Sequence, residues 1–104
     1  MPSGVVQDPN VPTNVLNTPS LRQYVAITAC DRSPNGYTAK GTANNPTKAE
    51  KPYTITVFFT TNRGTVIGTG AIKVSVLPGQ TQKWQIDGQL TPAPGTECVL
   101  RGVG

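Results

Sequence analysis

The chain contains two cysteines, Cys30 and Cys98, whose chemistry depends on what lies beside them. A catalytic thiol needs a basic partner, usually histidine, and the sequence has no histidine. A zinc site needs about four ligands in a recognisable spacing, which two isolated cysteines do not provide. Two interpretations are left, a disulfide and two free thiols. We favour the disulfide, which stabilises a fold by ~4 kcal/mol on the chain-entropy model and implies an oxidising compartment.

The oxygen-bearing side chains show no arrangement typical of an active site. A glycosidase needs two carboxyl groups a few ångströms apart in a cleft. The carboxylates here adjoin expected turns or strand ends, and we interpret them as solvated surface charge: Asp8, Asp31, Glu50, Asp87 and Glu97. The serines and threonines have no histidine to act as their base, and copper or iron sites are equally disfavoured. We therefore expect no enzymatic activity, no metal and no cofactor.

Three aromatic residues are the candidates for a binding surface. Tyr37, Tyr53 and Phe58 can form an exposed patch for a sugar or a protein, because contiguous surface aromatics signal binding. Phe58 draws most interest because it breaks the alternation of its strand. A position at a sheet edge, or in packing between sheets, is the alternative for Phe58.

The formal net charge is +4, from nine basic and five acidic residues. Nucleic-acid-binding proteins concentrate lysine and arginine in a stripe and interleave exposed aromatics, whereas the basic residues here are scattered along the chain. We therefore expect no nucleic-acid partner. Scattered positive charge favours weak attraction to an anionic cell-wall polymer or a membrane surface.

Residues 52–87 are the most strongly patterned stretch and predict three antiparallel strands joined by two tight turns. In the first strand the alternate residues are apolar, so this face is expected in the core: Tyr53, Ile55, Val57 and Phe59. Gly64 suits the positive φ of the first turn, and Pro78-Gly79 suits a type II second turn. Trp84, the only tryptophan, belongs in the centre of the core.

Three other stretches complete the expected strands. Residues 65–76 place one set of side chains on the core face, where the two glycines suggest a bulge or a bend: Val66, Gly68, Gly70, Ile72, Val74 and Val76. Residues 37–44 have a core face of small side chains, which predicts close packing against a bulkier neighbour. Residues 97–103 are expected to close the sheet.

The first strand, residues 24–30, has a conflict of parity. If Cys30 faces inward, strict alternation turns Val25 and Ile27 outward. Either Cys30 lies past the end of the strand or a bulge switches the faces.

Length and composition predict one all-β domain, with residues 1–21 as a flexible linker rich in proline, asparagine and threonine and residues 22–104 as the domain. An arrangement with Val15 to Leu21 laid along the sandwich is an alternative for the last part of the linker. A proline-rich recognition peptide is the alternative for the linker, on the weak motif from Pro9 to Pro12. No stretch is apolar for long enough to span a membrane, and the first residues lack the pattern of a signal peptide. If the protein is exported, we expect its signal or membrane anchor to lie outside these residues.

Several motifs resemble the FxLYD-type domain, an immunoglobulin-like β-sandwich, over residues 24–103. The motifs are the stretch 40–45, Phe59, Gly64, the stretch 66–68, the stretch 77–81 before Trp84, and Cys98-Val99-Leu100. The combination of one upstream cysteine, Cys30, with a Cys-x-Leu motif near the C-terminus is similar to that of modules in actinobacterial membrane-anchored proteins and lipoproteins. Thr60 and Thr61 stand where the family often has tyrosine and aspartate. The resemblance implies an immunoglobulin-like antiparallel sandwich of about six to seven strands, with no catalytic residues.

Two functions from different classes follow. The first is a non-catalytic extracellular interaction module of a bacterial cell envelope, monomeric, binding a protein or a cell-wall polymer through a sheet face or an exposed strand edge. The second is a secreted carrier of a small ligand, or an enzyme accessory domain, with an apolar pocket between its sheets. A tight core favours the first function, and a pocket lined from both sheets favours the second.

Overall fold

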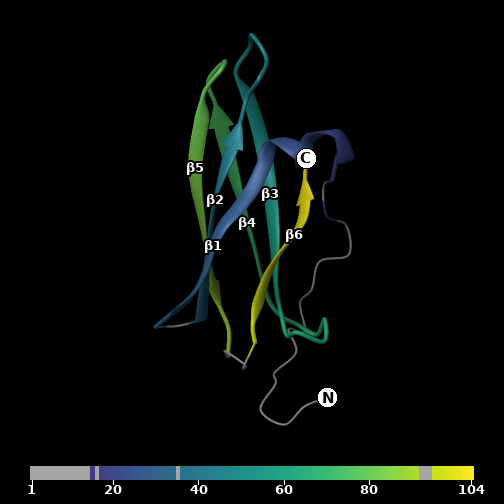
Figure 1. The fold of residues 1–104 in the computed structure, drawn as a ribbon, viewed down its shortest axis with the longest axis vertical. Helices are drawn as coiled ribbons and strands as arrows, with labels where there is room; N and C mark the ends of the chain where they lie inside the picture. The colour runs from purple at the N-terminus through teal and green to yellow at the C-terminus, as the bar shows by residue number, and fades with distance from the viewer. Residues whose placement is uncertain (1–14, 16, 35, 92–94) are drawn as a thin grey trace.

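The computed structural model describes residues 15, 17–34, 36–91 and 95–104. A short 3-10 helix, η1 (Pro19–Tyr24), precedes six strands: β1 (Val25–Ser33), β2 (Gly36–Asn44), β3 (Lys51–Thr60), β4 (Val66–Val76), β5 (Thr81–Gln89) and β6 (Glu97–Val103). The strands form two antiparallel sheets of three, in the orders β1-β2-β5 and β4-β3-β6 (Figure 1). Immunoglobulin-like sandwiches divide their strands in this way, with A, B and E in one sheet and C and F in the other. The predicted all-β sandwich is confirmed.

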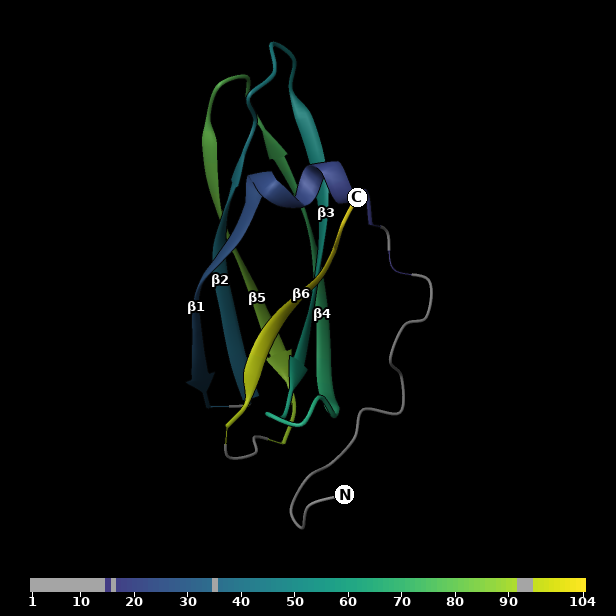
Figure 2. The same cartoon turned by 45° about the vertical axis from the view of Figure 1, so that its right-hand side comes forward.

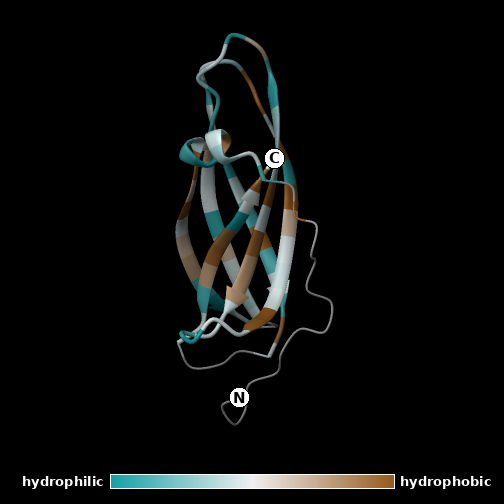
Figure 3. Ribbon diagram, turned by 90° about the vertical axis from the view of Figure 1, so that its right-hand side faces the viewer, coloured by the Kyte–Doolittle hydropathy of each residue, from teal (hydrophilic) through white to brown (hydrophobic). Residues whose placement is uncertain are grey.

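Strand β3 is the centre of its sheet and supplies most of the core. Its alternate residues Tyr53, Ile55, Val57 and Phe59 are all fully buried, as the period of two predicts. Hydrophobic and hydrophilic residues alternate along the strands (Figure 3). The facing sheet contributes small residues from β2 and large ones from β5, all within one apolar cluster: Ala39, Ala43, Trp84 and Ile86.

A bulge in β1 settles the conflict of parity at its cysteine. Ile27 pairs with Gly41, and Ala29 pairs with the neighbouring residue of β2, Lys40, so Thr28 is an extra residue in the strand. Beyond the bulge Cys30 pairs with Ala39. Since Ala39 and Gly41 lie on the same face of β2, Ile27 and Cys30 both face the core, and the second of the two expected arrangements is correct.

A second bulge lies at the start of β4. Phe59 pairs with Gly68 and Thr60 with Val66, so Ile67 is the extra residue. Ile67 packs in the core cluster. The expectation that Val66 lies on the core face was wrong, because the extra residue turns the residues before it to the opposite face of the strand. The bulge adjoins Gly68 but does not explain the glycine: a side chain there would meet Leu90, and one at Gly70 would meet Ile86.

Both expected turns are present. Gly64 has φ 86° in the turn after β3, where its backbone N–H donates to Thr61 O at 3.0 Å. Gly79 has φ 68° in the turn after β4, where Gln80 N donates to Leu77 O at 3.1 Å. These are left-handed conformations that glycine adopts without the steric cost other residues meet.

Strands β1 and β6 lie on the same side of the sandwich (Figure 2). Two contacts close this side. A disulfide joins Cys30 to Cys98, which lie 68 positions apart in the sequence with their Cα atoms 5.8 Å apart, and this confirms the predicted bond. The Arg22 guanidinium donates to Leu100 O at 2.7 Å and to Arg101 O at 3.1 Å, and so covers part of the β6 edge. These bonds occupy backbone carbonyl groups of β6 that a further strand could otherwise use for pairing.

The stretch just before η1 is also attached to β6. Thr18 N donates to Val103 O at 2.6 Å, and Val103 N donates to Asn17 Oδ1 at 3.3 Å. Residues 17–21 of the expected linker are therefore attached to the domain, in agreement with the alternative that Val15 to Leu21 lie along the sandwich. Residues 1–14 and 16 lie outside the described part of the chain. Within the described ranges, no helix has the length and apolar character needed to cross a membrane.

Candidate binding surface

The three aromatic residues expected to form an exposed patch lie apart. Tyr53 is fully buried on the inner face of β3, where its hydroxyl donates to Asn44 O at 2.8 Å. Burial raises the pKa of Tyr53, and the nearby Tyr24 raises it further. Tyr53 is therefore a core residue that no partner can reach.

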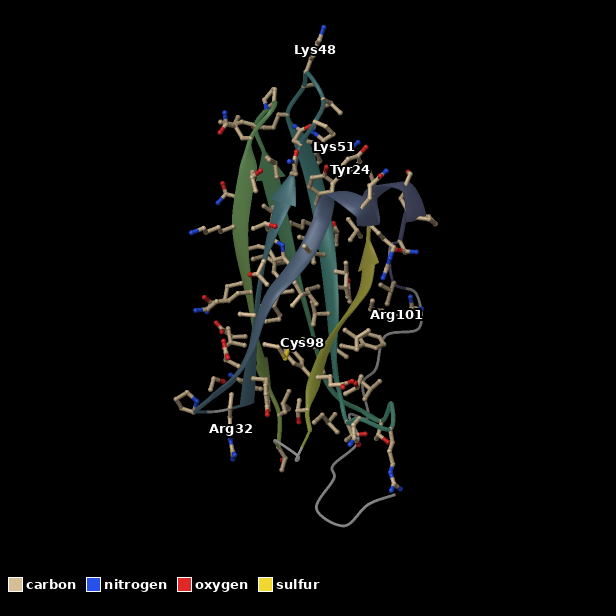
Figure 4. All side chains as sticks on the ribbon, in the orientation of Figure 1. Tyr24, Arg32, Lys48, Lys51, Cys98 and Arg101 are labelled. Carbon is tan, nitrogen blue, oxygen red and sulfur yellow. A yellow bond between two sulfur atoms is a disulfide. The ribbon has the colours of Figure 1, made fainter. Side chains whose placement is uncertain are left out.

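Phe58 occupies the opposite face of the same strand, as its break in the alternation requires. It is 9% exposed, and the Arg101 guanidinium carbon lies 5.8 Å from its ring centroid. Arg101 projects from β6 (Figure 4), and Val99 of the same strand pairs with Phe58. A cation over an aromatic face is attractive, so the ring is covered by its neighbour.

Tyr37 belongs to β2 in the other sheet and packs, partly buried, against the core. The expectation that these three residues form one exposed aromatic patch was therefore wrong. Alternation places Tyr53 and Phe58 on opposite faces of one strand, and the topology places Tyr37 in another sheet.

The outer face of the β1-β2-β5 sheet presents polar side chains instead. Because the inner face of β2 is made by Ala39, Gly41 and Ala43, the alternate residues of the strand must point outward. The register sets cross-strand pairs on this outer face: Thr38 with Asp87, Lys40 with Gln85 and Thr42 with Lys83.

A groove of about 650 Å³ crosses this face. We call it the lysine groove, and it is lined by Thr28, Lys40, Gly41, Thr42, Lys83, Trp84 and Gln85. Lys40 and Lys83 are diagonal neighbours in the register, which places the two residues roughly 7–8 Å apart, with their Cβ atoms somewhat closer. The β1 bulge supplies Thr28, whose hydroxyl donates to Lys40 O at 3.4 Å. Two ammonium groups thus lie among hydroxyl and amide groups, and the seven lining residues include no carboxylate.

Trp84 lies under the lysine groove. Its side chain is 4% exposed and packs against Gly41, its register partner on β2. Among the described residues, the indole Nε1 has no hydrogen-bond partner. As the single tryptophan of the chain, it is a spectroscopic reporter on the core side of this sheet.

A row of carboxylates borders the lysine groove. Thr38 pairs with Asp31 on one side and with Asp87 on the other. The Thr38 hydroxyl donates to Asp87 Oδ1 at 2.8 Å and Gln85 Nε2 donates to the same oxygen at 2.9 Å. The Thr38 bond, then the Gln85 bond, lowers the pKa of Asp87, and the charge of Lys40 adds to the effect. The face therefore has a basic part and an acidic part.

Two smaller hollows lie at the margins of the sandwich. One of about 410 Å³ runs between β4 and β5 and combines Ile72, Val74 and Trp84 with polar side chains. Another of about 290 Å³ involves Ser33, Pro34 and the end of β5. Within the described residues, no group of three or more histidine, cysteine, aspartate or glutamate side chains is placed to hold a metal ion.

One structural residue was missed entirely. Asn45 is fully buried, and its Nδ2 donates to Ala49 O at 2.7 Å and to Val76 O at 2.8 Å. Its Oδ1 accepts from Thr47 N at 3.0 Å and from the Thr47 hydroxyl at 2.6 Å. No pattern in the sequence singles out Asn45, and only the fold shows that its amide ties the β2–β3 connection to β4.

The arrangement as a whole is that of a disulfide-bonded sandwich with a polar groove on one sheet. No family model, curated protein or solved structure matches this chain.

Proposed function

We propose that this domain is a non-catalytic interaction module of a bacterial cell envelope and binds its partner through the lysine groove. The observation that carries the proposal is a groove of about 650 Å³ on the outer face of a sheet, with four exposed side chains in its lining that can donate hydrogen bonds: Thr28, Lys40, Lys83 and Gln85. A binding surface built on strands is held in place more firmly than one built on loops.

The disulfide supports a location outside the reducing cytoplasm, where such bonds form and persist. The resemblance to FxLYD-type modules of actinobacterial lipoproteins and membrane-anchored proteins points to the same compartment. In that setting a signal or anchor elsewhere in the protein would display the domain at the cell surface.

The experiment is an NMR titration of the isotopically labelled domain with solubilised cell-envelope fractions. We expect amide shifts confined to the outer face of β1, β2 and β5. Thr42→Tyr, which obstructs the lysine groove, should abolish them. Thr54→Tyr is the matched control, because Thr54 is an equally half-buried threonine on the outer face of the other sheet. Shifts that follow Thr54→Tyr instead would refute the assignment of the surface.

A second candidate is a carrier of a small apolar ligand. The hollow between β4 and β5 supports it, because Ile72 and Val74 contribute apolar surface there. Its remaining lining residues are mostly polar, which fits such a ligand less well. Quenching or enhancement of Trp84 fluorescence by an apolar dye would favour the carrier over the interaction module if Ser75→Tyr, which obstructs this hollow from an exposed position, abolishes it and Thr42→Tyr does not.

A further inference from the structure

We infer that the lysine groove takes a linear polymer of polyol phosphates, in which phosphodiesters alternate with hydroxyl-bearing units; this inference rests on the proposed function. Three features of the groove select this ligand: its charge, the kind of cation in it and the side chains around the lysines.

Charge complementarity selects an anionic ligand. Lys40 and Lys83 lie on adjacent strands and are both exposed. Asp31 and Asp87, in the acidic row beside the groove, would repel an anion and so confine it to the basic part of the face. The net charge of +4 adds a long-range attraction.

The kind of cation in the groove favours a phosphate over a carboxylate as the ligand. Carboxylates are recognised best by the planar fork of arginine, which binds both oxygens at once, whereas lysine acts as a point charge and is a common phosphate ligand. The lining residues of the groove include two lysines and no arginine. Two point charges on diagonal positions suit successive phosphodiesters of a flexible chain.

The side chains around the lysines favour a polyol phosphate over a nucleic acid as the ligand. Proteins that bind single-stranded nucleic acid stack bases on aromatic side chains. Among the described residues that line this groove, the one aromatic side chain is that of Trp84, which is 4% exposed and offers no platform for a base. Thr28, Thr42 and Gln85 offer hydroxyl and amide groups, which suit the hydroxyls of a polyol.

The test uses a purified glycerol-phosphate oligomer as the probe and Trp84 fluorescence as the readout, with calorimetry as a second readout. We expect saturable binding that weakens with salt, with a slope of log K against log salt of roughly −1.4 for two lysines. Lys40→Gln with Lys83→Gln should weaken binding roughly ten-fold or more. Both side chains are exposed, so the melting temperature of this double variant should stay that of the wild type.

The matched control is Lys48→Gln with Lys51→Gln, which removes the same charge from the β2–β3 connection and the first residue of β3 (Figure 4). It should change the affinity less than two-fold, because those lysines lie towards the tip of the sandwich, away from the groove. A single-stranded oligothymidylate, a carboxylate polymer and a neutral dextran complete the panel, and each should bind more weakly than the glycerol-phosphate oligomer.

Equal losses in the two double variants would overturn the inference, because the attraction would then be to net charge alone. Equal or tighter binding of the oligothymidylate or the carboxylate polymer would overturn it as well. If the oligomer fails to bind while envelope fractions still shift the amides of the groove, the inference fails and the proposed function stands. If neither binds, both fail.

Discussion

The indole of Trp84 on β5 occupies the space that a side chain at position 41 of β2 would need. The two residues are register partners, and a Cβ atom on Gly41 would meet the six-membered ring of Trp84 and the backbone oxygen of Ala26. The small inner face of β2 thus exists to admit the largest side chain of β5. The sequence pattern predicted such a bulkier neighbour without naming it.

Gly41→Ala should therefore destabilise the domain by about 3 kcal/mol, since neither a packed ring nor a backbone oxygen can move without further loss. Guanidinium denaturation followed by Trp84 fluorescence measures the change. Gly79→Ala is the control: Gly79 has φ 68°, and a Cβ atom added to it would meet nothing within 4 Å, so it should lose only about 1 kcal/mol from backbone strain. A loss at Gly41 no larger than at Gly79 would show that the sheet relaxes around the added methyl group.

The disulfide predicts a large dependence of stability on oxidation. Cys30→Ala with Cys98→Ala should lower the free energy of unfolding by ~4 kcal/mol, because the bond closes a long loop and restricts the unfolded chain. A phosphine reductant should lower the stability of the wild type by a similar amount and leave the double variant unchanged. A wild type equally stable with and without reductant would contradict the prediction.

The hydrogen bonds of Asn45, which is not among the lining residues of the lysine groove, predict an effect on stability. Asn45→Ala should cost about 3 kcal/mol, because it removes the side-chain donor to the buried Val76 O, while Ala49 O keeps the Thr47 hydroxyl as a partner. Thr47→Ala should cost only about 1 kcal/mol, since it removes a hydroxyl at an exposed position. Thermal unfolding of both variants compares them directly. Equal losses would mean that the loop and not the buried amide determines the stability of this end.

A structural feature could be predicted from the sequence where it depends on one strand or one turn alone. The burial of Tyr53, Ile55, Val57 and Phe59 follows from a period of two along β3, and the turns at Gly64 and Gly79 follow from the conformations that glycine allows. These features need no knowledge of the partner strands. The same alternation also implied that Tyr53 and Phe58 face opposite ways, which an aromatic patch would contradict.

The sequence could suggest a bulge in the first strand, but the positions of features that arise from pairing could not be predicted from it. The bulges at Thr28 and Ile67 are defined only against β2 and β3, and composition allows one at several positions. The lysine groove is likewise a product of register, because Lys40 and Lys83 meet only when β5 pairs with β2. Polar outward residues on each strand were visible separately, but their meeting required the order of the strands in the sheet.

The hydrogen bonds of Asp87 predict a dependence of stability on acid. Because Thr38 and Gln85 stabilise the carboxylate, its pKa in the folded state lies below that in the unfolded state. The resulting stabilisation is present above the unfolded pKa and is lost as pH falls through the folded pKa. NMR titration of the side-chain carboxyl should show a midpoint below the usual range of an aspartate. Thr38→Val should raise this midpoint more than Gln85→Ala, since the Thr38 bond is the larger cause. The reverse order, or a midpoint that neither substitution moves, would show that these bonds do not hold the carboxylate in solution.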